Sequence, residues 1–65
     1  MKLSGDPRGI DVLRKFKDEK PEYLKFLLKS AQTNFDRRAR FKDEEGNEFV
    51  LEYDPLKKEF NVFRD

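Results

Sequence analysis

Apolar side chains recur at two different spacings along this chain, and the change of spacing divides it into a helical part and an extended part. The first helical signal is Asp6 followed by Pro7, which is typical of an N-cap and the first helical position. Apolar residues then recur at helical spacing, at Ile10, Leu13 and Phe16. We therefore predict a helix over about residues 6–18, preceded by a short polar lead over residues 1–5 that we expect to be frayed.

A second helix is predicted over about residues 21–32. Pro21 cannot continue the first helix without breaking its hydrogen bonds, so a boundary is expected there. The residues that follow form one apolar stripe, at Leu24, Leu27, Leu28 and Ala31. Phe26 lies about 140° around the helix from that stripe, at ~100° per residue, so it does not belong to the expected core face.

Beyond residue 35 the apolar spacing changes to two. This alternation predicts three half-buried antiparallel strands over about residues 36–43, 47–54 and 59–64. The inward positions are Ala39, Phe41, Phe49, Leu51, Tyr53, Phe60 and Val62. With Leu13, Phe16 and the three leucines of the second helix, they make the expected core.

The two loops between these strands fix their register. Gly46 suits the left-handed end of a three-residue hairpin loop, which sets Phe41 opposite Phe49. A four-residue loop begun by Pro55 sets Tyr53 opposite Phe60. Both loops keep the same face inward. The sequence thus predicts one α+β domain over residues 1–65, with two N-terminal helices on one face of a three-stranded antiparallel meander (ααβββ).

The residue types present argue against catalysis. The chain has no His and no Cys, so the commonest general base and the strongest nucleophile are missing. A two-layer domain of 65 residues is also expected to have little room for a typical ligand cavity. The one acidic cluster, Asp43, Glu44, Glu45 and Glu48, fits a solvated hairpin tip. A calcium loop with Gly46 at its sixth position would have Phe41 at the first position, where an oxygen ligand is required. We expect no enzyme activity, no cofactor and no metal.

Charge is dense and unevenly distributed. Charged residues make up 45% of the chain, yet the formal net charge is +1. Residues 1–42 hold twelve basic and six acidic side chains, whereas residues 43–65 hold three basic and eight acidic ones. This asymmetry is typical either of an interaction surface or of two halves that pair with each other in the fold. With no apolar run that could span a bilayer, we expect a cytoplasmic protein that does not bind membranes, unless the chain is designed and has no natural location.

A basic strand raises the possibility of nucleic-acid binding. Its residues are Arg37, Arg38, Arg40 and Lys42, and clusters of this kind contact phosphates. The predicted register, however, sets Glu52 opposite Arg38 and Glu48 opposite Lys42, as ordinary cross-strand charge pairs. We therefore rank nucleic-acid binding behind protein binding.

Three apolar residues fall outside the expected core and are the candidates for partner binding. Phe26 is one, and Val50 and Phe63 face each other on the outer side of the predicted sheet. If uncovered, Val50 and Phe63 would form the apolar patch that marks an interface. We expect a monomer or a weak dimer. We rank two functions equally. One is a small module that binds a protein by surface contact, and the other is a designed or engineered scaffold with no natural ligand.

Overall fold

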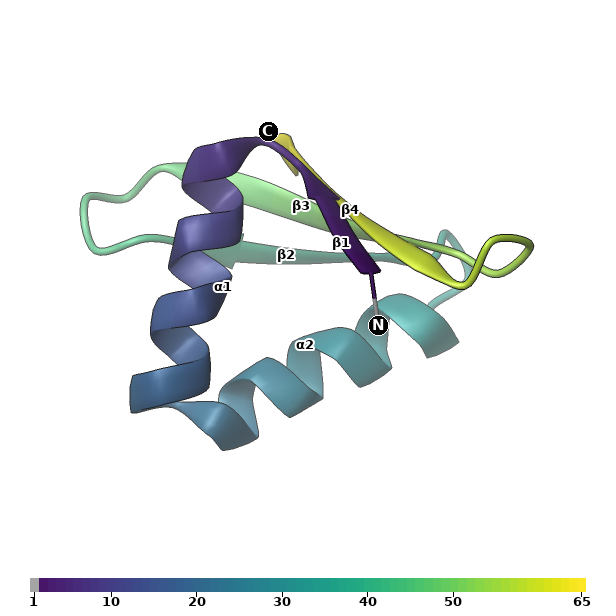
Figure 1. Ribbon diagram of the computed structural model, residues 1–65, viewed down its shortest axis with the longest axis horizontal. Helices are drawn as coiled ribbons and strands as arrows, with labels where there is room; N and C mark the ends of the chain where they lie inside the picture. Colours follow the sequence, from purple (N-terminus) through teal and green to yellow (C-terminus); the bar gives the residue numbers. More distant parts are fainter. Residues whose placement is uncertain (1) are drawn as a thin grey trace.

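The computed structural model describes residues 2–65 and shows an α+β protein in which two helices lie against one face of a sheet (Figure 1). Met1, the first residue of the predicted polar lead, lies outside the described residues. The elements are β1 (Lys2–Gly5), α1 (Pro7–Glu19), α2 (Pro21–Thr33), β2 (Arg38–Lys42), β3 (Glu48–Asp54) and β4 (Glu59–Arg64).

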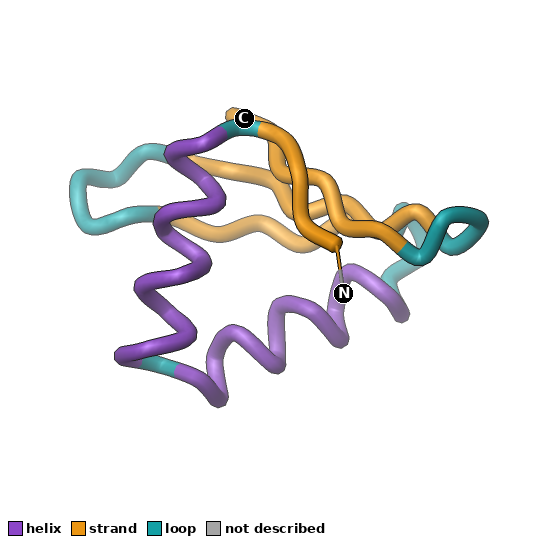
Figure 2. Tube along the Cα trace, in the orientation of Figure 1, coloured by secondary structure: helices purple, strands orange, loops and turns teal. Residues whose placement is uncertain are grey.

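Both helices begin as their sequences indicate. The carboxylate of Asp6 accepts hydrogen bonds from the backbone N–H groups of Arg8 and Gly9, at 2.9 and 3.3 Å, and so caps α1. Pro21 is the first residue of α2, and Lys20 alone separates the two helices. Because the connection is so short, the chain turns sharply at the corner seen in Figure 2, and the end of α1 stays close to the start of α2.

The sheet has four strands rather than the predicted three. Its strand order is β1-β4-β3-β2, and β1 runs parallel to β4, so the sheet is mixed. The prediction of a purely antiparallel meander with a frayed lead is therefore wrong for Lys2–Gly5. Leu3 faces Phe60 in this pairing and packs against the core, which gives β1 its apolar contact.

The register predicted for the other three strands is confirmed. Phe41 pairs with Phe49, Tyr53 pairs with Phe60, and the charged residue Arg38 pairs with Glu52. Gly46 has a φ of +87°, as the first hairpin loop requires. The loop is held by Asp43, whose N–H donates to the carbonyl of Asn47 at 3.1 Å.

The core lies between the helices and the inner face of the sheet. Its buried residues there are Leu13, Leu27, Ala31, Ala39, Phe41, Phe49, Leu51, Phe60 and Val62. Four other predicted core residues, Phe16, Leu24, Leu28 and Tyr53, are partly buried and pack against this cluster. Since α2 lies against β2 and β3 while α1 reaches β1 and β4, the two helices divide the inner face between them.

Candidate functional site

The four basic residues of the predicted nucleic-acid strand do not form one basic surface. Arg38 Nε lies 2.9 Å from Glu52 Oε2, and Lys42 Nζ lies 3.4 Å from Glu48 Oε1. Arg40 stands between them opposite Val50, and it has no carboxylate partner among residues 2–65. Two of the cations are therefore already neutralised by the neighbouring strand.

Arg37 belongs to the turn before β2 and not to the strand itself. It has a φ of +59°, and its guanidinium donates a hydrogen bond to the carbonyl of Gln32 in the last turn of α2. Its own carbonyl accepts the backbone N–H of Tyr53 at 2.8 Å. The Arg37 side chain thus binds the C-terminal end of α2, and Arg37 lies outside the strand that carries the other three cations.

Replacing Arg38 and Arg40 together by Gln should change the free energy of unfolding by less than about 1 kcal/mol, since exposed ion pairs contribute roughly 0–1 kcal/mol. Binding of wild type to a fluorescent single-stranded oligonucleotide should be weak. Urea unfolding and fluorescence anisotropy measure the two effects. Sub-micromolar binding that falls steeply with salt would instead make nucleic acid the favoured ligand.

Of the two apolar residues predicted for the outer sheet face, only Phe63 is open. Phe63 is 43% exposed, but Val50 is only 8% exposed, although no helix covers that face. Val50 lies between Arg40 on β2 and Phe63 on β4, so its cross-strand neighbours flank it on both sides. The proposed Val50–Phe63 apolar patch is therefore reduced to the ring of Phe63.

Phe26 has a different setting, at the outer end of a continuous series of aromatic rings. The series starts in the core, where Phe49 stacks on Phe41 with ring centroids 5.5 Å apart. Phe41 meets Phe16 at 6.2 Å, and Phe16 meets Tyr23 edge-to-face at 5.2 Å. Tyr23 stacks on Phe26 at 6.5 Å. Because Tyr23 is 40% and Phe26 63% exposed, the series of rings extends from the core to the solvent-exposed surface.

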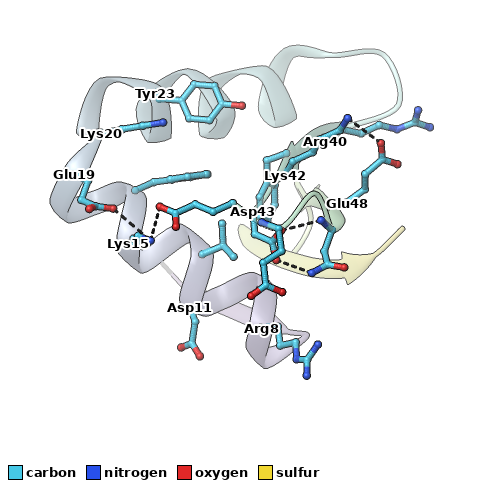
Figure 3. Close-up of a pocket in the computed structure, with 16 residues that line it drawn as sticks. Arg8, Asp11, Lys15, Glu19, Lys20, Tyr23, Arg40, Lys42, Asp43 and Glu48 are labelled. Atoms are coloured by element: carbon cyan, nitrogen blue, oxygen red, sulfur yellow. Dashed lines mark hydrogen bonds and ion pairs between the residues drawn. The ribbon is translucent and has the colours of Figure 1, made fainter.

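A groove with a volume of about 980 Å³ runs beside this aromatic series (Figure 3). The groove is open to solvent and is not an enclosed cavity. Its apolar lining comes from Val12 and Phe16 of α1, Tyr23 of α2 and Phe41 of β2. One wall is α1 and the other is the β2–β3 hairpin. The sharp turn at Lys20 creates the space, because it holds the two helices at an angle rather than side by side.

An ion pair joins the two walls of the groove. Lys15 Nζ of α1 lies 2.6 Å from Glu44 Oε1 of the hairpin tip and 4.0 Å from Glu19 Oε2 (Figure 3). The hydrogen bond to Glu44 raises the pKa of Lys15, and the same bond, with the charge of Lys15, lowers the pKa of Glu44. The hairpin is therefore tied to α1 at neutral pH.

The contact between Lys15 and Glu44 is expected to depend on pH. The pKa of Glu44 is lower in the folded protein than its usual 4.5, so the contact is complete above that value and is lost as pH falls through the folded pKa. NMR titration should show a Glu44 midpoint below 4.5, and Lys15→Met should return the pKa of Glu44 towards its ordinary value. An unchanged midpoint in Lys15→Met would contradict the contact.

Besides Tyr23, two other exposed apolar residues were not identified as exposed from the sequence. Phe35 lies fully exposed in the turn after α2, and Leu56 is 95% exposed in the β3–β4 loop. Both loops are at the end of the sheet opposite the β2–β3 hairpin, so neither residue belongs to the groove. Single exposed apolar residues are common on protein surfaces. Their loop positions, next to Asn34 and to Pro55, are the sequence signal that would have indicated exposure.

Other kinds of site find no support among the described residues. Across residues 2–65 no three His, Cys, Asp or Glu side chains are grouped so that they could hold a metal ion. No helix in the same part of the chain has the length and apolar character needed to cross a bilayer. Neither a protein-family model, nor a curated protein, nor a solved structure matches this chain.

Proposed function

We propose that this protein is a small non-catalytic module that binds a protein partner through the aromatic surface of Tyr23 and Phe26 and the groove beside it. The observation that carries the proposal is the series of stacked rings ending in these two exposed residues. Aromatic side chains held rigidly at a surface lose little conformational entropy on binding, and aromatic anchors of this kind dominate binding energies at protein interfaces.

Two further features support protein binding over the alternatives. The absence of His and Cys leaves the groove without the usual catalytic groups. The groove is also lined by both signs of charge, including Lys15, Lys20, Asp43 and Glu48, which suits a polypeptide better than a polyanion. The competing proposal is a designed or engineered scaffold with no natural ligand.

Selection from a display library of random peptides tests the proposal directly. Wild type is immobilised, and enriched peptides are measured against wild type and against the double variant Tyr23→Ser with Phe26→Ser. We expect the double variant to bind about tenfold or more weakly, because removing an anchor of this kind costs about 2 kcal/mol. Thermal melting checks that the double variant is folded.

Phe35→Ser is the matched control. It removes a more exposed ring at the opposite end of the sheet, so affinity should stay within about twofold of wild type. Failure to enrich any peptide that distinguishes wild type from the double variant would favour the scaffold without a ligand.

A further inference from the structure

We propose that the open edge of β2 is the docking site for an extended acidic segment of the partner, which adds to the sheet as an extra strand. The inference rests on the proposed function, and it specifies the partner's chemistry and its mode of binding. Main-chain hydrogen bonds supply affinity in this kind of recognition, and alternate side chains supply specificity.

The backbone pattern shows which residues of β2 face outward. Hydrogen-bonded and non-hydrogen-bonded pairs alternate along an antiparallel ladder. Before β2, the carbonyl of Arg37 accepts from Tyr53, and after it the N–H of Asp43 donates to Asn47, so the odd-numbered residues bond to β3. The peptide groups of Arg38, Arg40 and Lys42 therefore point away from the sheet.

Only part of this outward edge is open. The N–H of Arg38 donates to Asp36 Oδ1 at 3.1 Å, and its carbonyl accepts from Asn34 Nδ2 at 2.7 Å. No side chain among residues 2–65 caps the backbone of Arg40 or Lys42 in this way. The outward backbone groups of Arg38 are thus already hydrogen-bonded. Those of Arg40 and Lys42, which line the groove, remain available to a partner strand.

The surroundings of the open stretch select the side chains of the added strand. On the outer face, that strand would lie next to Arg38, Arg40 and Lys42, and Arg40 lacks a carboxylate partner among the described residues. Opposite charges on neighbouring strands are favourable, so acidic residues fit there. On the inner face, the added strand would lie against the apolar lining of the groove, where Phe16 and Tyr23 favour apolar side chains. An alternation of acidic and apolar residues satisfies both faces.

A second copy of this chain fits the same edge poorly. Two β2 strands placed side by side would bring Arg40 of one copy, which has no carboxylate partner among the described residues, next to the basic side chains of the other copy. Like charges on neighbouring strands are destabilising, and such residues protect sheet edges from self-association. The edge therefore discriminates against the protein itself while it remains attractive to an acidic strand.

The test uses blocked peptides in which Glu alternates with Val or Tyr, titrated into the ¹⁵N-labelled protein. We expect saturable binding that shifts the amide signals of Arg40 and Lys42, and no binding of the same peptide with Lys in place of Glu. Two peptides are then N-methylated, one on the Glu amides and one on the apolar residues. Only one set of amides can face β2, so one peptide should lose about tenfold or more in affinity and the other less than about twofold.

Protein variants give an independent test. Arg40→Pro removes an outward N–H and leaves the ladder to β3 intact, because proline is tolerated where an edge strand's N–H faces solvent. Arg40→Gln is the control that removes the same charge and keeps the N–H. Binding should fall about tenfold more in Arg40→Pro than in Arg40→Gln. If Arg40→Pro does not fold, the methylated peptides decide the question alone.

The outcomes separate this inference from the proposed function. No binding of the acidic peptide, or equal binding of the two methylated peptides, overturns strand addition. If library-selected peptides still depend on Tyr23 and Phe26 in that case, the aromatic surface binds proteins by another mode and the proposed function stands. Loss of both kinds of binding would contradict both strand addition and the proposed function.

Discussion

Phe49→Ala should remove a large fraction of the stability of this protein. Phe49 is fully buried, at 0% exposure, and stacks on Phe41 at the centre of the core. Truncating a buried phenylalanine costs about 3–5 kcal/mol, because apolar contacts are lost and a cavity remains. Domains are stable by roughly 5–15 kcal/mol, and a chain of 65 residues has a limited core, so the loss is a large fraction of the total.

Urea unfolding followed by circular dichroism measures this effect. With a denaturant dependence of about 1 kcal/mol per molar for so small a domain, the midpoint should fall by ~3 M or more. Phe26→Ala deletes the same side chain from a site that is 63% exposed. Its free energy of unfolding should change by no more than about 1 kcal/mol, so its urea midpoint should shift by about 1 M or less. Equal losses in the two variants would show that Phe49 does not hold the core together.

Gly5→Ala should have the second-largest effect, because the backbone at Gly5 leaves no space for a side chain. Gly5 has a φ of +120°, and a Cβ there would overlap the backbone of Val62 in the neighbouring strand. Backbone strain costs about 1–3 kcal/mol, and overlap in a packed region a further 1–3 kcal/mol, so we expect a loss of about 3 kcal/mol.

Gly46→Ala is the matched control, since Gly46 also has a positive φ but has no atom within 4 Å of its hypothetical Cβ. Its loss should be about 1–2 kcal/mol, from backbone conformation alone. Urea unfolding of the two variants compares them. A Gly5→Ala variant as stable as wild type would mean that β1 is not fixed beside β4, as expected for the frayed lead predicted from sequence.

The three strands β2, β3 and β4 could be predicted because local signals specify them. Each hairpin loop carries its own turn residues, Gly46 in one and Pro55 in the other, and both loops bring apolar faces together. β1 lacked such signals. Leu3 is the only apolar residue of Lys2–Gly5, and its partner strand β4 is distant in sequence and parallel, so no turn indicated the pairing.

The candidate site was predictable only where it depends on a single helix or a single hairpin. The exposure of Phe26 follows from its angle on a single helix, and the Arg38–Glu52 pair follows from a hairpin register. The groove depends on the angle between α1 and α2, which the single linking residue Lys20 sets and no periodicity encodes. The role of Arg37 was missed because the predicted strand began two residues before the observed start at Arg38.

Amide hydrogen exchange tests most directly whether the β2 edge beside the aromatic surface is the binding site. In the protein alone, Arg40 and Lys42 should exchange quickly, while Ala39 and Phe41, which bond to β3, should exchange slowly. Saturation with the acidic peptide should protect the amides of Arg40 and Lys42 about tenfold or more and leave Arg38, already bonded to Asp36, nearly unchanged. Amides of Arg40 and Lys42 that exchange equally fast with and without saturating peptide would contradict binding at this edge.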